Sequence, residues 1–79
     1  MPLEMELAKK LEIVLDGLAY HIIEYHKERI GIKEISDYES GLKLIEVIKE
    51  SLINVVGEKM ANRVYEELVV WLKEKFGVR

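Results

Sequence analysis

Hydrophobic positions recur with a helical period along most of the chain. The first stripe consists of Leu7, Leu11, Val14, Leu18, His21 and Tyr25, spaced three and four residues apart. Such spacing places side chains on one face of an α-helix, so it predicts a long first helix over residues 3–29. The stretches 37–56 and 58–76 show the same period and predict a second and a third helix.

Glycines mark the predicted helix ends. Gly31 and Gly77 each follow a turn that contains basic residues, and an apolar residue comes directly after each glycine. This order is typical of helix C-termini, where glycine adopts a left-handed conformation and the next residue folds back on the last turn. Gly57 separates the second helix from the third. Ser36 fits the start of a capping box for the second helix, with Asp37 as the alternative cap.

The predicted fold is all-α: one domain of 79 residues, a three-helix bundle in up-down-up order with a long first helix. So short a chain buries only about 60–65% of the surface that it exposes when unfolded. It has no cysteine for a disulfide, and small domains of this kind often gain stability by oligomerisation, so we expect packing into a dimer. The predicted core is Leu7, Leu11, Val14, Leu18, Ile22, Ile45, Ile48, Leu52, Val64, Leu68, Trp71 and Leu72.

Charge and composition narrow the environment. The net charge is −3, with lysine and glutamate interleaved, whereas nucleic-acid binders usually carry a basic excess or face. No apolar run approaches the roughly 20 residues that a membrane helix needs, and we expect a cytoplasmic protein. The chain lacks Gln, Thr and Cys and has two Asn, a bias typical of proteins from hot habitats. We therefore expect a thermophilic, archaeal source.

The two histidines do not form a predicted metal site. His21 and His26 lie five residues apart, about 140° around a helix, whereas two ligands on one helix need a spacing of three or four. His21 is predicted at the edge of the core and His26 at its boundary. The sequence also lacks a cysteine nucleophile, a glycine-rich phosphate loop and a pattern pairing serine with histidine and an acid. No catalytic residue and no cofactor are predicted, and we expect a protein that is not an enzyme.

Several apolar residues fall outside the predicted core stripes. They are Ile13, Tyr20 and Ile23 on the first helix and Val70 on the third. A cluster of exposed hydrophobic side chains typically marks a contact surface. We therefore predict an interaction face, and with it a small helical interaction or oligomerisation module that binds a second copy or another helical protein.

Two other functions remain open. The first is small-molecule sensing, with His21, Tyr25, Tyr65 and Trp71 lining a pocket between helices. The second is an accessory role in nucleic-acid binding, against which the acidic net charge argues.

One resemblance bears on function. From Leu18 to about Val78 the chain has a helix ending in an aromatic residue, charges and glycine, a short connector, and a helix ending in a glycine turn. This pattern resembles small archaeal helical domains of the Nitrosopumilus output domain type, and Tyr25, Gly31, Leu52 and Gly57 carry the match. The resemblance implies a signalling or regulatory role exerted through protein contacts. It carries over no catalytic residue.

Overall fold

Helices make up most of the chain. The computed structural model describes residues 2–78, and four α-helices lie within that range. They are α1 (Leu3–Leu15), α2 (Ala19–Ile30), α3 (Tyr38–Val56) and α4 (Glu58–Phe76), with a 3-10 turn, η1 (Asp16–Leu18), between α1 and α2. The all-α class and the three helical regions are thus confirmed. None of the helices in residues 2–78 combines the length and apolar character needed to cross a membrane.

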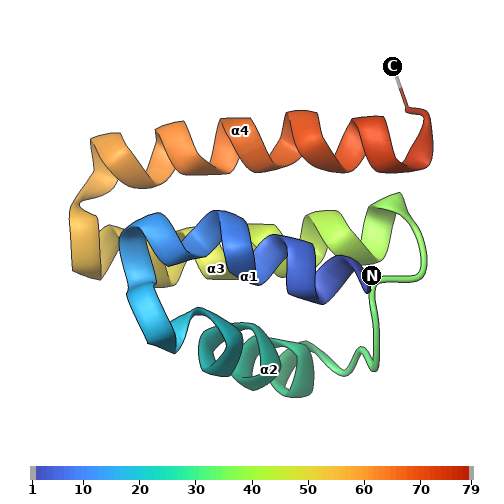
Figure 1. Ribbon diagram of the computed structural model, residues 1–79, viewed down its shortest axis with the longest axis horizontal. Helices are drawn as coiled ribbons and strands as arrows, with labels where there is room; N and C mark the ends of the chain where they lie inside the picture. Colours follow the sequence, from blue (N-terminus) through green and yellow to red (C-terminus); the bar gives the residue numbers. More distant parts are fainter. Residues whose placement is uncertain (1, 79) are drawn as a thin grey trace.

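The single long first helix was a wrong prediction, because the chain turns sharply in its middle. Asp16 has a φ of 50° and a ψ of −135°, which ends the regular helical backbone of α1. After the 3-10 turn, α2 runs back along α1 (Figure 1). The up-down-up order had counted residues 3–29 as one helix, so the turn gives the chain one more reversal than predicted.

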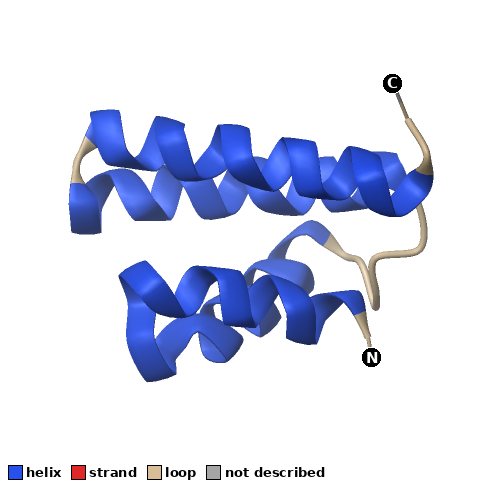
Figure 2. Ribbon diagram, turned by 45° about the horizontal axis from the view of Figure 1, so that its top comes forward, coloured by secondary structure: helices blue, strands red, loops and turns tan. Residues whose placement is uncertain are grey.

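The second half of the chain is a helical hairpin. Helices α3 and α4 lie side by side and are joined at Gly57 (Figure 2). Asp37 caps α3: its carboxylate accepts a hydrogen bond from the Ser40 N–H at 2.8 Å, and the Ser40 hydroxyl accepts one from the Asp37 N–H at 3.2 Å. The alternative cap is therefore the observed one, in place of Ser36.

The predicted glycine endings are confirmed. Gly31 and Gly77 adopt left-handed conformations with φ values of 76° and 65°. The N–H of Ile32 donates to the Lys27 carbonyl at 3.0 Å, which closes the last turn of α2. This is the geometry expected where glycine and an apolar residue end a helix.

The core lies between the two helix pairs and follows the prediction in part. Leu18, predicted as core, is 62% exposed, and Val14, Ile22 and Val64 are half-buried. The turn at 16–18 explains Leu18 and Ile22, because it rotates α2 relative to a continuous helix and turns different side chains inward. Val14 precedes the turn and packs, partly buried, against the core. The buried hydrophobic residues are Leu7, Ala8, Leu11, Leu15, Ala19, Ile23, Ile35, Leu44, Ile45, Ile48, Leu52, Ala61, Leu68, Trp71 and Leu72.

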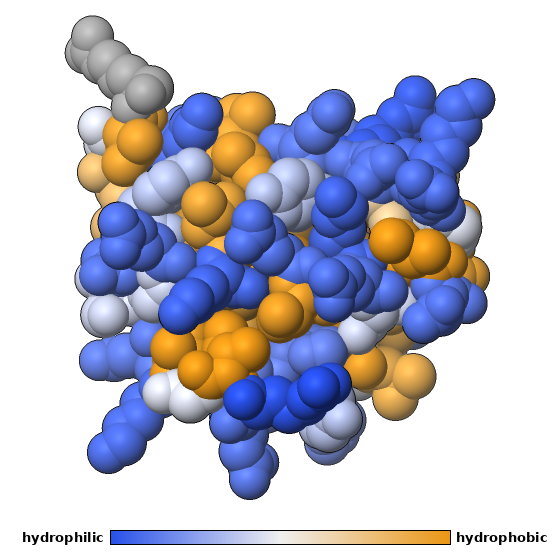
Figure 3. All heavy atoms as spheres, turned by 180° about the vertical axis from the view of Figure 1, so that it is seen from behind, coloured by the Kyte–Doolittle hydropathy of each residue, from blue (hydrophilic) through white to orange (hydrophobic). Residues whose placement is uncertain are grey.

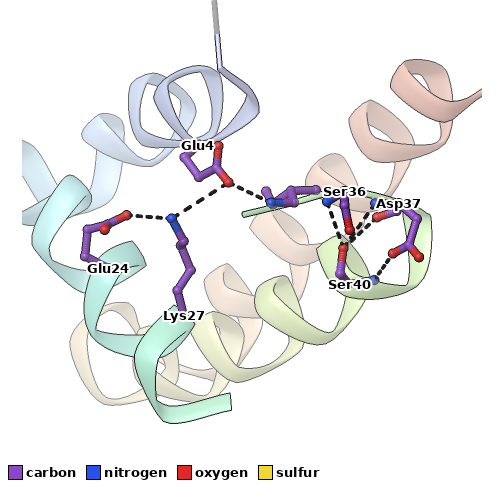
Figure 4. Close-up of polar contacts among 7 residues, drawn as sticks. Glu4, Glu24, Lys27, Ser36, Asp37 and Ser40 are labelled. Atoms are coloured by element: carbon purple, nitrogen blue, oxygen red, sulfur yellow. Dashed lines mark hydrogen bonds and ion pairs between the residues drawn. The ribbon is translucent and has the colours of Figure 1, made fainter. Parts of the chain in front are cut away.

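A buried carboxylate connects α1 to the segment that precedes α3. Glu4 is 9% exposed, and its Oε1 accepts a hydrogen bond from the Ile35 N–H at 2.7 Å (Figure 4). The Lys27 ammonium of α2 lies 3.8 Å from the same oxygen and 3.0 Å from Glu24. The first turn of α1 is therefore held to both α2 and the connector.

We expect removal of this carboxylate to destabilise the fold. Glu4→Ala leaves the Ile35 N–H unpaired, which should lower the free energy of unfolding by about 1–3 kcal/mol. Glu4→Gln keeps an acceptor oxygen and should recover most of that loss. Urea denaturation measures both variants, with Glu66→Ala on the exposed side of α4 as the control. A Glu4→Ala variant as stable as Glu66→Ala would contradict this role.

Gly41 permits close packing of α3 against α4. A Cβ at this position would lie 2.6 Å from Leu72 Cδ1 and 3.1 Å from Ile35 Cγ2. We expect Gly41→Ala to lower the free energy of unfolding by about 1–2 kcal/mol, because overpacking outweighs the gain in helix propensity. Gly17 has no neighbour within 4 Å of such a Cβ, so Gly17→Ala is the matched control and should cost nothing. Equal losses in urea denaturation would refute the packing argument.

Candidate interaction surface

Helix α1 carries an aliphatic side chain on its outer side. Ile13 is 89% exposed, while Leu7, Leu11 and Leu15 of the same helix are buried on the opposite side. Tyr20, at the start of α2, is 47% exposed. Three of the four predicted face residues lie at the surface: Ile13 and Tyr20 near the turn that joins α1 to α2, and Val70 on α4.

Two shallow grooves run along α1. The α1–α4 groove, of about 360 Å³, is lined by Lys10, Ile13, Met60, Arg63, Val64, Glu67 and Leu68. The α1–α2 groove, of about 420 Å³, is lined by Met5, Ala8, Lys9, Glu12, Asp16, Gly17, Ala19 and Tyr20. Met5 and Met60 are each 41% exposed, so both grooves have a flexible apolar wall. We call Met5, Ile13, Tyr20 and Met60 the α1 face.

Ile23 does not belong to this face, and its inclusion was wrong. Its side chain is fully buried, because the turn at 16–18 directs it into the core together with Ala19. Val70 is 56% exposed on α4 but lines neither of the two grooves.

Exposed hydrophobic side chains also occur away from α1. The side of the molecule opposite to that in Figure 1 shows them in separate patches between hydrophilic residues (Figure 3). Leu18, Tyr25 and Val55 are each more than half exposed. Exposure alone therefore does not select a surface, and the α1 face is distinguished by the grooves beside its most exposed residue.

The four residues predicted to line a ligand pocket do not converge, which removes that pocket. Trp71 is buried in the core, and its Nε1 lacks a hydrogen-bond partner within residues 2–78. His21 is exposed on α2. Tyr25 and Tyr65 line different grooves. The prediction failed for His21 and Tyr25 because it placed both on the inner face of one continuous helix.

Each of the two tyrosines instead contacts a cation, within α2 for Tyr25 and between α4 and α3 for Tyr65. The Arg29 guanidinium lies 5.7 Å from the centre of the Tyr25 ring, and the Lys49 ammonium lies 4.8 Å from that of Tyr65. Burial raises the pKa of the Tyr65 hydroxyl, and the nearby Glu46 carboxylate raises it further. These are surface cation–π contacts, which typically contribute about 0.5–1 kcal/mol each.

The buried histidine is His26, the reverse of the prediction for the two histidines. It is 4% exposed, and its Nε2 lies 2.7 Å from the Ser51 hydroxyl oxygen of α3. Burial lowers the pKa of His26 from its usual 6.5, the positive charge of Arg29 lowers it further, and Glu50 opposes the shift. Burial and the charge of Arg29 thus favour a neutral imidazole at this contact between α2 and α3.

A serine hydrogen-bonded to histidine also occurs in nucleophilic catalysis, which requires more than this pair. Ser51 lies within α3, whose backbone N–H groups are engaged in helical hydrogen bonds, so they are not free to hold an oxyanion beside its hydroxyl. No cluster of three or more His, Cys, Asp or Glu side chains within residues 2–78 is arranged to bind a metal ion. We interpret the pair as a structural link between α2 and α3.

No protein-family model, curated protein or solved structure matches this chain.

Sequence reasoning missed Met5 and Met60 in the grooves and the contact between His26 and Ser51. One signal could have led to the histidine: Asp16 followed by Gly17 is a common turn dipeptide. Starting a new helix after that turn aligns Ala19, Ile23, His26 and Ile30 at intervals of four, three and four. The groove walls have no comparable signal, because they depend on how α1 sits against α2 and α4.

The stability of the fold should depend on the protonation of His26. Because its pKa is lower in the folded chain than in the unfolded chain, the unfolded chain takes up the proton first as the pH falls. The contribution of His26 to the free energy of unfolding should therefore be constant above pH 6.5. It should decrease as the pH falls from 6.5 past the lower pKa that His26 has in the folded chain.

Urea denaturation between about pH 8 and pH 5 measures this effect. His26→Gln should remove that part of the pH dependence, whereas His21→Gln, on the exposed side of the same helix, should retain it. If the His26→Gln variant shows the same pH dependence of unfolding as the wild type, His26 is not responsible for it.

Proposed function

We propose that this protein is a non-enzymatic helical interaction module that forms a homodimer through the α1 face. The observation that carries the proposal is Ile13, an aliphatic side chain 89% exposed on the outer side of α1. Burial of one such side chain contributes about 1.5–3 kcal/mol, and a symmetric dimer gains this twice. Met60 and Met5 line the grooves on the two sides of α1, and their flexible side chains can adapt to a partner helix that packs against α1.

The other two functions have less support. A small-molecule sensor would need an enclosed pocket with converging polar groups, and its four predicted residues lie apart. Nucleic-acid binding would need a basic surface, whereas the net charge is −3 and both grooves along α1 carry acids as well as bases. The regulatory role that the resemblance implies is compatible with a dimerising module, and we retain it as part of the proposal.

The oligomeric state tests the proposal. Sedimentation equilibrium at micromolar concentration should give the mass of two 9.2 kDa chains for the wild type. Ile13→Glu should raise the dissociation constant by about a hundredfold or more, because two buried contacts are replaced by charges. The circular dichroism spectrum should be unchanged, since residue 13 makes almost no contribution to the core of its own chain, and the melting temperature should fall only by the stability that dimerisation adds.

Val55→Glu is the matched control. Val55 is 61% exposed near the end of α3, lies outside both grooves, and should leave the dimer intact when replaced. A wild-type protein that sediments as a single 9.2 kDa chain would refute the proposed function.

A further inference from the structure

The charges along α1 have an order that specifies how two copies meet. Lys9 and Lys10 precede Ile13 in the middle of the helix, whereas Glu12 and Asp16 lie beside or beyond it. Among the charged side chains here that form no ion pair or hydrogen bond within residues 2–78, the positive ones therefore lie in the middle of α1 and the negative ones, Glu12 and Asp16, at its C-terminal end.

These charged groups are available to a partner. Lys9, Glu12 and Asp16 are exposed and line the α1–α2 groove, and none of them forms an ion pair within residues 2–78. The other acids of α1 are engaged: Glu6 pairs with Lys75 of α4 at 2.8 Å, and Glu4 binds the Ile35 N–H. Of the exposed charged residues that line the α1–α2 groove, Lys9 therefore forms a cationic half, and Glu12 and Asp16 form an anionic half.

We propose that the dimer is antiparallel, with α1 of one copy packed against α1 of a second copy across a twofold axis near Glu12 and Ile13. This arrangement rests on the proposed function. The second copy is the partner that fits, because turning the same face by a half-turn reverses its order of charges. Lys9 of each copy then lies opposite the anionic half of the other, which contains Glu12 and Asp16.

The spacing along the helix is consistent with this pairing. Lys9 and Asp16 are seven residues apart, which is about 10 Å along the helix axis, and both line the α1–α2 groove. An axis between residues 12 and 13 lies midway between them. A parallel dimer would place Lys9 opposite Lys9 and Asp16 opposite Asp16, which like-charge repulsion disfavours, whereas the antiparallel dimer brings like charges together only at Glu12 beside the axis.

The same symmetry arranges the hydrophobic contacts. Ile13 lies next to the axis, so the two copies of this side chain lie close to one another at the centre of the contact. Met5 lies near one end of the α1–α2 groove, and Tyr20 follows the turn at the other end of α1. The half-turn brings Met5 of one copy towards Tyr20 of the other. Each exposed apolar side chain along α1 is thus covered by an apolar side chain of the second copy.

Charge exchange tests the arrangement. Lys9→Glu places a carboxylate opposite Glu12 and Asp16 of the second copy, twice per dimer, and should raise the dissociation constant about tenfold to a hundredfold at low salt. Glu12→Lys should also weaken the dimer. An equimolar mixture of the two variants should form a heterodimer more readily than either forms a homodimer, and the combined variant Lys9→Glu with Glu12→Lys should recover part of the wild-type affinity.

Sedimentation equilibrium measures each dissociation constant, and native mass spectrometry identifies the heterodimer. Lys43→Glu is the control, since Lys43 is an exposed lysine of α3 that lines a different groove. A dimeric wild type that Lys9→Glu leaves unchanged would overturn the antiparallel arrangement and keep the proposed function. A monomeric wild type would overturn both.

Discussion

The backbone of Asp16 takes a positive φ of 50°, and the packing of α1 against α2 follows from this local reversal. Aspartate tolerates such a conformation better than most residues, and Gly17 after it adds little steric resistance. The turn divides what would otherwise be one continuous rod over residues 3–29 into two short helices that pack against each other. Neither α1 nor α2 is long enough to be stable by itself, so each depends on the contacts that the turn creates.

Two buried polar contacts hold these short helices to the α3–α4 hairpin. Glu4 binds the backbone of the connector that leads into α3, and His26 binds Ser51 within α3. Both bridge elements that are distant in sequence, which is where a domain without disulfides gains specificity for one arrangement. Both contacts are also sensitive to change. A buried N–H left without an acceptor, or a buried imidazole that becomes protonated, costs more free energy than the contact itself contributes.

The turn also creates the surface to which we assign the function. It brings the start of α2 beside α1, which forms the α1–α2 groove with Tyr20 at one end and leaves Ile13 on the outer side between two grooves. A straight helix over residues 3–29 would have had no such groove. The exposed isoleucine and the divided charges of α1 belong to one face, so the same helix supplies both the affinity and the orientation of the proposed dimer.

The periodic hydrophobic pattern determined the all-α class, and the glycines determined the ends of α2, α3 and α4, because helical spacing and left-handed glycine caps are local properties that few neighbours can alter. The exposure of Ile13 also followed from the pattern. The burial of Ile23 and His26 and the exposure of His21 were decided by the tertiary structure. Their positions depend on the rotation of α2 after a turn of three residues, and a period read across that turn assigns each of them to the wrong side. The grooves and the buried contacts likewise require α1, α2 and the hairpin to meet, which no local spacing records.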